Sequence, residues 1–422
     1  MTRKKSLRCS VVGMTVMALP AVSVHAAGFI EDSKASLTLR NFYYNHDLRD
    51  STAPAQSKIE EWAQGFIFKA QSGYTDTPVA IGMDVYAGLG LKLDSSPDRS
   101  GSALLPGAYK RVGAPRNADP RSADEYSEAT AAVKIKVSKT ELKVGGLFPK
   151  IPLVYAGDSR LLPQTFRGAL LNVQEIDKLT LQGGTINQIK ANSSTDYTDM
   201  TANRIGGNSD SFVFGGGDYK LTPALTAGLH YGNLEDIYQQ YYGTLVHLLP
   251  LGDGQSLKTD LRYSRSREDG NFRNLDNRAF GAMFTYTLGG HAVGAGYQRM
   301  GGDDPFPYIA SSDPFLVNFV QINDFANTEE RSWQVRYDYN FASLGIPGLT
   351  FMTRYISGDN VEVAGRSAEG KEWERNMDIA YVVQNGPLKN LGLKWRNATV
   401  RSNFGNDLDE NRLILSYSLA LW

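Results

Sequence analysis

The sequence contains a single cysteine, Cys9, and only five histidines in 422 residues. After the first 26 residues it also has no apolar run near 18 residues, the length that a membrane-spanning helix needs. Hydrophobic residues make up only 41% of the chain. These absences argue against a disulfide framework and a helical membrane protein. They do not argue against a membrane β-barrel, because barrel strands alternate their apolar residues with polar ones.

A boundary between domains is also missing. A soluble chain of this length usually divides into two or three domains, yet no Pro/Ser linker or change in composition marks a division. One large closed sheet would account for both the length and the uniform composition.

The N-terminus has the pattern of a secretory signal. Four basic residues precede the apolar run Val11–Ala21, and the small residues of Val24-His25-Ala26 follow. We expect residues 1–26 to be a signal peptide cleaved after Ala26, since an anchor helix needs a longer apolar run. Cleavage would remove Cys9 and leave 40 basic against 45 acidic side chains in residues 27–422. Any basic feature of the mature barrel domain must therefore be local.

Residues Ser332–Asn360 show the strand pattern most clearly. Trp333, Val335 and Tyr337 share one face, while Gln334 and Arg336 share the other. Similar segments of about ten residues predict an all-β fold, a transmembrane antiparallel barrel of about 18 strands. The predicted strands are Ser36–Tyr44, Glu60–Ser72, Val79–Leu93, Ala129–Ser138, Glu141–Leu147, Ala169–Glu175, Leu179–Asn187, Ser211–Tyr219, Ala224–Gly232, Tyr242–Leu249, Ser256–Ser266, Ala279–Thr287, His291–Arg299, the two strands of Ser332–Asn360, Asn376–Gln384, Leu391–Val400 and Arg412–Leu421.

The connections alternate in length. Short turns of the Gly73–Pro78 kind alternate with long links, as expected of a barrel with periplasmic turns and extracellular loops. A Greek-key sandwich gives no reason for this alternation. The final segment Arg412–Trp422 is predicted to close against the first strand, with Trp422 one position beyond the apolar register. The long links are Asp94–Glu128, Phe148–Gly168, Gln188–Asp210, Met300–Arg331 and Gly358–Arg375.

Several blocks, in order, resemble the OprD-type substrate-specific outer-membrane porins of pseudomonad-like bacteria. They include GFIEDSKASLTLRNFYYN, GLGLKLD, AVKIKVSKTELKVGGLFPK, SRLLPQTFRG, LEDIYQQYY, the whole of Ser332–Asn360 and RLILSYSLAL. The resemblance implies an eighteen-stranded barrel in the outer membrane of a Gram-negative bacterium. It also implies an eyelet formed by inward-folded loops and the passage of small carboxylate-bearing molecules. DPFLVNFVQI at Asp313–Ile322 resembles the branch, including OpdK, that is associated with aromatic and other monocarboxylates.

Basic side chains are predicted to face the lumen. Lys394 and Arg396 lie two positions apart, about 7 Å along the strand, and no carboxylate shares their face of that strand. A carboxylate could pass along such a ladder from one guanidinium group to the next, because several moderate sites suit conduction better than one tight site. In the alternative, these charges pair with Asp84, Asp260, Asp338 and Asp378. The predicted inward basic residues are Arg40, Lys134, Lys136, Arg262, Arg336, Arg354, Lys394 and Arg396.

Two long links are candidates for insertion into the pore. Phe148–Gly168 is stiffened by three prolines, and by the resemblance its Asp158 and Arg160 are eyelet candidates. Met300–Arg331 is rich in aromatics and is equally compatible with a plug that never touches substrate. Tyr86, on the inner face of the third strand, is a further contact candidate.

The sequence thus predicts passive uptake of small, aromatic or otherwise monocyclic carboxylates by a channel that needs no cofactor. A channel for basic amino acids and small peptides is the alternative. A barrel hydrolase using His230 or His247 as a lipid-facing base, and a soluble all-β binding protein, are the other classes considered. Predicted partners are the carboxylate substrates, outer-membrane lipid and lipopolysaccharide, and the barrel-assembly machinery, with no nucleic acid. A monomer or loose trimer is expected.

Overall fold

A computed structural model describes residues 27–49, 56–107 and 121–422. Its main feature is one antiparallel sheet of 18 strands, which confirms the predicted number. The strands are β1 (Lys34–Leu48), β2 (Lys58–Gln71), β3 (Ala80–Asp94), β4 (Glu125–Val137), β5 (Thr140–Leu147), β8 (Thr165–Val173), β9 (Leu179–Lys190), β12 (Phe212–Thr222), β13 (Leu225–Leu234), β14 (Tyr238–Gly252), β15 (Gln255–Glu268), β16 (Asp276–Leu288), β17 (His291–Gly301), β19 (Arg331–Asn340), β20 (Leu349–Val361), β21 (Gly370–Val382), β22 (Gly392–Ser402) and β23 (Leu408–Ala420).

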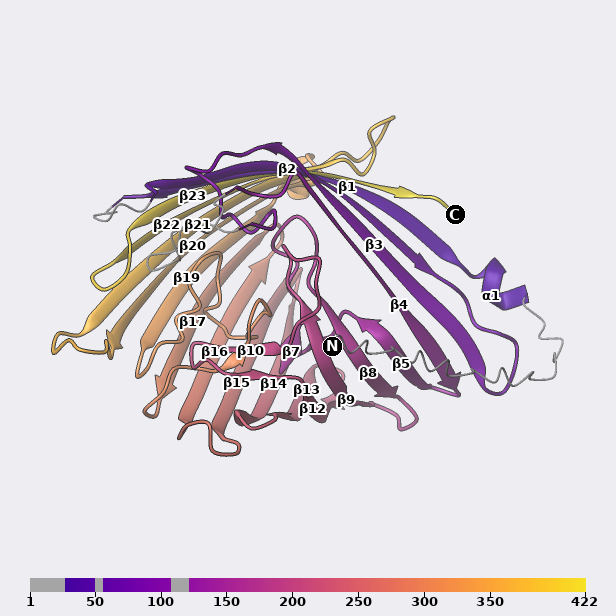
Figure 1. Ribbon diagram of the computed structural model, residues 1–422, viewed down its shortest axis with the longest axis horizontal. Helices are drawn as coiled ribbons and strands as arrows, with labels where there is room; N and C mark the ends of the chain where they lie inside the picture. The colour runs from indigo at the N-terminus through magenta and orange to yellow at the C-terminus, as the bar shows by residue number, and fades with distance from the viewer. Residues whose placement is uncertain (1–26, 50–55, 108–120) are drawn as a thin grey trace, which may run out of the picture.

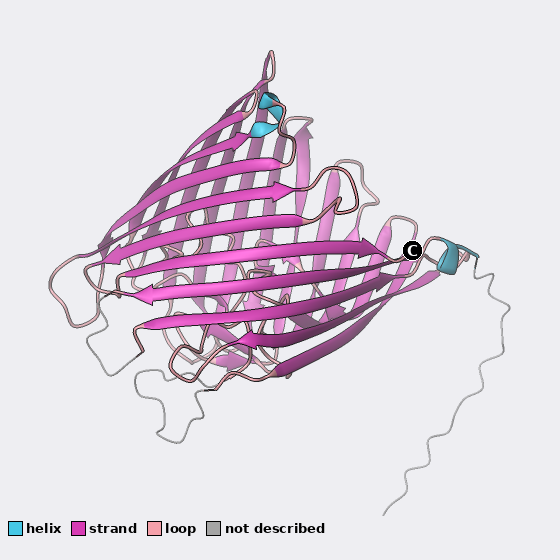
Figure 2. Cartoon of the chain, turned by 90° about the horizontal axis from the view of Figure 1, so that it is seen from above, coloured by secondary structure: helices cyan, strands magenta, loops and turns pink. Residues whose placement is uncertain are grey.

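The sheet closes on itself into a barrel (Figures 1 and 2). Each strand pairs with the next one of the barrel, and the last strand, β23, pairs with β1 from Ser36↔Ala420 to Leu48↔Leu408. The Thr38 and Ser418 hydroxyls lie 2.8 Å apart across this seam. Closure satisfies the backbone groups of both edge strands, which a bilayer cannot hydrate. The predicted closure is confirmed.

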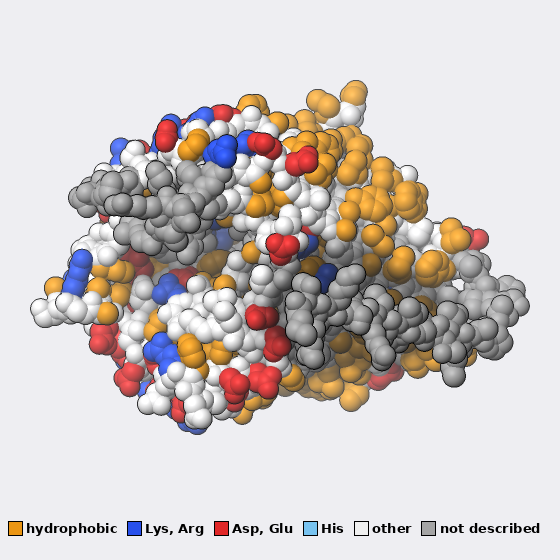
Figure 3. Space-filling view, viewed as in Figure 1, with side chains coloured by type: hydrophobic (Ala, Val, Ile, Leu, Met, Phe, Trp, Pro, Cys, Tyr) orange, Lys and Arg blue, Asp and Glu red, His pale blue; other side chains and the backbone are white. Residues whose placement is uncertain are grey.

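Alternation places apolar residues outside and polar residues inside. On β19, Trp333 and Val335 are about half exposed, whereas Ser332 and Gln334 are buried on the inner face. Figure 3 shows hydrophobic side chains over the outer surface towards α1 (Ala27–Glu31) and charged side chains gathered at the opposite end. Within the described residues, no helix is long and apolar enough to cross a membrane.

The strands are longer than predicted at the end that carries the long loops. β14 begins at Tyr238 instead of Tyr242, and β4 begins at Glu125 instead of Ala129. The predicted link Gly358–Arg375 is wrong in extent, because β20 runs to Val361 and β21 begins at Gly370. Above the membrane both faces of a strand can carry polar residues, so the alternation that marks a strand fades there. The predicted signal peptide lies outside the described residues.

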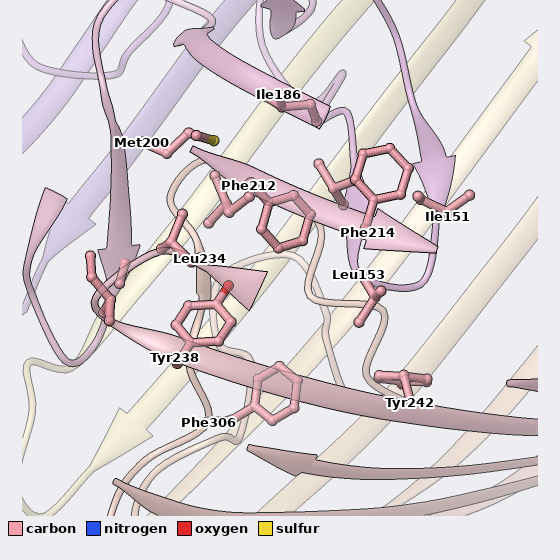
Figure 4. Packing of buried hydrophobic residues seen from close by; sticks show 14 of the residues in the cluster. Ile151, Leu153, Ile186, Met200, Phe212, Phe214, Leu234, Tyr238, Tyr242 and Phe306 are labelled. Carbon is pink, nitrogen blue, oxygen red and sulfur yellow. The ribbon is translucent and has the colours of Figure 1, made fainter. Parts of the chain in front are cut away.

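Three loops fold into the barrel and fill part of it. One contains β6 (Lys150–Ile151) and β7 (Val154–Tyr155); in the other two, β10 (Met200–Asn203) pairs with β11 (Asn208–Ser209) and with β18 (Tyr308–Ile309). A short 3-10 helix, η1 (Phe341–Leu344), lies in the turn after β19. Figure 4 shows Ile151 and Leu153 from the first loop gathered with Phe212, Phe214 and Tyr242 of the wall. The core of this protein therefore lies inside the barrel, between the wall and the loops.

Candidate functional site

The loop between β5 and β8, residues 148–164, is packed against the wall at both of its ends. Ile151, Leu153 and Val154 are buried in the apolar cluster next to β12 and β14. Leu161 and Leu162 are buried in a second cluster, with inward residues of β1 to β4. The polar segment between them, Gly157-Asp158-Ser159-Arg160, therefore spans part of the lumen.

Arg40 of β1 holds this segment to the wall. Its guanidinium donates two hydrogen bonds to Asp158, at 2.7 and 3.2 Å, and others to the carbonyl oxygens of Arg160 and Leu161 at 2.8 and 3.3 Å. A paired arrangement of this kind is geometrically specific as well as strong. Arg40, Asp158 and Arg160 were separate candidates in the sequence, and the structure brings all three together. The Arg40 charge is neutralised by the loop, while the Asp158 side chain remains 54% exposed.

Arg160 lies in a cluster of charged and aromatic groups. Its Nε donates to the Ser102 carbonyl oxygen at 3.1 Å, and its guanidinium lies 5.6 Å from the Tyr44 ring centroid. Arg412 lies 5.5 Å from the same ring and donates to Glu410 at 2.6 Å. Burial lowers the pKa of the Arg160 guanidinium, and the charge of Arg412 lowers that pKa further. Two arginines thus flank one tyrosine beside the inserted loop.

The loop between β17 and β19, residues 302–330, meets the first inserted loop. The Asp313 amide donates to the Tyr155 carbonyl oxygen at 3.0 Å. A Cβ on Gly157 would lie 2.5 Å from the Ser311 carbonyl oxygen, so glycine is required for this approach. Arg262 of β15 binds the second loop, donating to the Phe315 carbonyl oxygen at 2.7 Å and lying 4.0 Å from the Phe315 ring centroid. Arg262 therefore points inward as predicted, where it anchors this loop.

Five basic residues on the inner face of β19 to β23 form what we call the basic wall. Arg336 and Arg354 are direct cross-strand neighbours, as are Arg396 and Arg412. Arg354 donates to the Asn376 amide oxygen at 2.6 Å, and no described carboxylate bonds to its guanidinium. The inward-facing bases predicted from the sequence include all of these residues except Arg412. The members of the basic wall are Arg336, Arg354, Lys394, Arg396 and Arg412.

The strand that carries Lys394 and Arg396 has no carboxylate on the same face, as the sequence indicated. The neighbouring strand nevertheless supplies one. Asp378 on β21 lies 3.1 Å from both the Lys394 ammonium and the Arg396 guanidinium. It is the cross-strand neighbour of Arg396, a position that depends on strand register. Arg336 is likewise chelated by Asp338, with two contacts of 2.7 Å. The predicted ladder is therefore a row of cations interleaved with acids.

A cavity of about 710 Å³ is bordered by the first inserted loop and, from the basic wall, by Arg396. Asp158 and Arg396 both line it, and Asp84, Lys143 and Asp313 are among its other charged residues. Tyr86 also borders it and points inward as predicted. The Tyr86 side chain is nevertheless buried, with its hydroxyl donating to Glu128 and its ring 5.1 Å from that of Phe148. This geometry makes Tyr86 part of the support beneath the loop.

Some functional candidates were missed and others were misplaced. Arg412 shares the inward face that alternation assigns opposite Leu413 and Leu415, so the sequence pattern could have identified it. The suggestion that His230 faces lipid is wrong: His230 is buried on the inner face, 3.6 Å from Asp218. In the part of the chain that the structure describes, no group of His, Cys, Asp and Glu residues is arranged to hold a metal ion.

Comparisons with known proteins agree with this architecture. Residues 27–421 match the family model described as outer membrane porin, OprD family. The chain is 43% identical over 403 residues to the porin-like protein GalP of Pseudomonas putida, covering 94% of each chain. It is similar to the crystal structure of Pseudomonas aeruginosa OccK3 (OpdO), with 58% identity, a TM-score of 0.82 and coverage of 94% of this chain and 98% of that one. The crystal structure of Pseudomonas aeruginosa OpdK with vanillate has 39% identity and a TM-score of 0.86, with 94% and 100% covered.

Proposed function

Because the chain belongs to the OprD family of outer-membrane porins, we propose that its channel favours small carboxylates, in particular aromatic or other monocyclic ones. The protein is an outer-membrane β-barrel channel for small molecules, and it is not an enzyme.

The basic wall is the observation that supports this preference. Among the described residues no carboxylate hydrogen-bonds to the Arg354 guanidinium, and Lys394 and Arg396 share the single carboxylate of Asp378. A carboxylate moving past these groups could exchange one two-pronged hydrogen bond for the next. The interleaved acids Asp338 and Asp378 would weaken each site, and conduction needs binding that is weak enough to release the substrate.

The relatives support an aromatic carboxylate as the substrate class. Vanillate, the compound in the OpdK crystal structure, is an aromatic ring bearing one carboxylate. In this chain the Phe148, Tyr155 and Phe319 side chains border the same cavity as Arg396. An aromatic ring could contact these apolar surfaces while its carboxylate faces the basic wall.

A channel for basic amino acids is the second candidate, and one observation favours it. The 710 Å³ cavity is also lined by Asp84, Glu141, Asp158 and Asp313. Asp158 is the most open of the ion-paired acids around the loop, with about half of its side chain exposed. An ammonium or guanidinium substrate could bind there while its carboxylate faces Arg396.

Single-channel recording in planar bilayers distinguishes these candidates. Benzoate or arginine is added to one side of the wild-type protein, and the Lys394→Ala/Arg396→Ala double variant is compared with it. We expect benzoate to perturb the current, arginine not to, and the double variant to lose several-fold in anion conductance. A Lys139→Ala/Lys178→Ala variant removes the same charge from exposed turns and is the matched control. Perturbation by arginine alone would favour the second candidate, and an unchanged double variant would contradict the role of these two residues.

The remaining predicted associations are also proposals. We propose that the barrel-assembly machinery inserts the protein through the closing strand β23, that lipopolysaccharide surrounds its outer half, and that the channel is a monomer or loose trimer. The signal peptide of residues 1–26 stays a prediction.

A further inference from the structure

Arginines gather on the outside of the barrel as well as in its lumen. Arg265, Arg278, Arg299 and Arg331 lie on β15, β16, β17 and β19, and they share the outward face with exposed Tyr263, Phe280, Tyr297 and Trp333. We call these four residues the outer arginine collar. Each arginine is two residues from its aromatic neighbour, always towards the long-loop end of its strand.

Strand register makes the collar continuous. Arg265 is the cross-strand neighbour of Arg278, and Arg299 is the cross-strand neighbour of Arg331. Arg278 and Arg299 are diagonal neighbours, because Arg278 lies opposite Gly301 and Phe280 lies opposite Arg299. Direct neighbours have Cβ atoms about 5 Å apart, and diagonal neighbours are about 7–8 Å apart. The four guanidinium groups can therefore reach a common headgroup.

The acids around the collar do not neutralise it. Asp276 serves both Arg265, at 3.5 Å, and Arg278, at 3.3 Å. Arg299 and Arg331 have no hydrogen-bonded or ion-paired side chain among the described residues, although Asp359 is the other cross-strand neighbour of Arg331. Like charges directly opposite each other destabilise a sheet. This pair therefore favours an anion from outside the chain.

The position of the collar indicates what that anion is. Exposed aromatic residues of a barrel mark the level of the lipid headgroups. The collar lies about 7 Å beyond these aromatics, on the extracellular side and on the surface that faces lipid. Paired guanidinium groups match the oxygens of a phosphate group, which they can bind in a two-pronged manner. A second copy of the chain is a poorer candidate for the anion, because its own collar would bring more arginines to this surface. The lumen substrate is excluded because it passes on the other side of the barrel wall.

We propose that the outer arginine collar binds the phosphate groups of the phosphorylated glycolipid in the outer leaflet, the lipid A part of lipopolysaccharide, with Arg299 and Arg331 as the main clamp. This site is separate from the conduction path. Its occupant would hold one side of the barrel, β15 to β19, to the outer leaflet and would add a negative charge beside two arginines that no described side chain hydrogen-bonds or ion-pairs.

Native mass spectrometry of the detergent-purified full-length mature protein tests the proposal with lipid A as the probe. We expect Arg299→Gln/Arg331→Gln to bind bisphosphorylated lipid A at least tenfold more weakly than wild type. Lys139→Gln/Lys178→Gln makes the same change of net charge at the opposite end of the barrel and should bind as wild type does. Equal binding by the Arg299→Gln/Arg331→Gln variant would overturn the proposal.

Two further arms identify the ligand and protect against misfolding. Lipid A lacking both phosphates should bind wild type and the Arg299→Gln/Arg331→Gln variant equally weakly. Inorganic phosphate alone should bind at least a hundredfold more weakly than lipid A. Phosphate alone binding as tightly as lipid A, or phosphate-free lipid binding as tightly, would overturn the glycolipid assignment. If the double variant does not show the heat-dependent gel migration of a folded barrel, each single variant is measured, and wild-type binding by both would overturn the clamp.

Discussion

At the scale of single residues, charges in the lumen differ in how fully their neighbours compensate them. The Arg40 guanidinium donates its hydrogen bonds to the loop of residues 148–164, and Arg336 forms an ion pair with Asp338. Lys394 and Arg396 depend on one carboxylate, that of Asp378. The electrostatic field that a permeating anion meets is therefore set by a few acids as much as by the many bases.

Asp378→Asn should increase anion selectivity by removing the one acid between Lys394 and Arg396. We expect the ratio of anion to cation permeability, measured from reversal potentials in a salt gradient, to rise about two- to fivefold, because roughly 0.4–1 kcal/mol of attraction for cations is lost. Asp177→Asn, in an exposed turn, makes the same charge change away from the lumen and should leave the ratio unchanged. A lower ratio in Asp378→Asn would contradict this prediction.

At the scale of elements, two of the three inserted loops, residues 148–164 and 302–330, contact each other where the Asp313 amide donates to the Tyr155 carbonyl oxygen. The loop of residues 148–164 is fixed by apolar packing at two ends and by Arg40 in the middle. Burial of one leucine side chain contributes about 1.5–3 kcal/mol, so the apolar ends hold the loop even when polar contacts exchange with water. The polar contacts then decide where the segment at Asp158 rests.

Arg40→Gln should loosen that segment without unfolding the barrel. A hydrogen bond to a charged group is worth about 1.5–3 kcal/mol, so the displaced form of the loop should become at least tenfold more populated. In single-channel records we expect more frequent current transitions and a wider distribution of conductance. Arg167→Gln, at an exposed arginine of β8 whose side chain bonds Gln188 and none of residues 148–164, is the control. A current as quiet as that of wild type would show that packing alone positions the segment.

The second loop should respond to pH through Asp313. Burial raises the pKa of the Asp313 carboxyl, although the Phe315 amide and the Arg262 charge act in the opposite direction. The docked loop therefore holds a proton more tightly than the undocked loop does, and docking loses stability as pH rises from about 4 through the raised pKa.

Hydrogen exchange across residues 302–330, corrected for intrinsic rates, measures this response. Protection in the wild type should fall as pH rises, by up to about tenfold per pH unit within that window. Asp313→Asn should remove the dependence, and the control Asp303→Asn, at an exposed position of the same loop, should keep it. Protection that rises with pH in the wild type would contradict the assignment.

How far the sequence predicted these elements depends on the range of the contacts. Period-two alternation located all 18 strands, because the polarity of each residue depends on which face of the sheet it occupies and not on which strand lies beside it. The Asp378 contact with Arg396 escaped because it depends on register between two strands. The Arg40 contact with Asp158 joins residues 118 positions apart through a loop whose path no local pattern specifies. Arg412 beside Glu410 was within reach of the alternation that identified Lys394 and Arg396.

At the scale of the whole molecule, the mature chain is predicted to begin at Ala27, where α1 begins. Intact mass and N-terminal sequencing of protein isolated from outer membranes test this directly. We expect a mass without residues 1–26 and without Cys9, so the protein should not react with a thiol reagent. A retained N-terminal segment or a different first residue would contradict the predicted cleavage site.

The seam between β1 and β23 also limits when the protein can fold. The hydroxyls that meet there belong to residues 380 positions apart, so the ring cannot close until nearly the whole chain has left the ribosome and crossed the inner membrane. Until then β1 carries an open edge that can pair with any other extended chain. The chain must therefore cross the periplasm unfolded and shielded from other chains. A fragment that stops before Leu408 lacks β23, so its barrel could not close and it would be exposed to proteases.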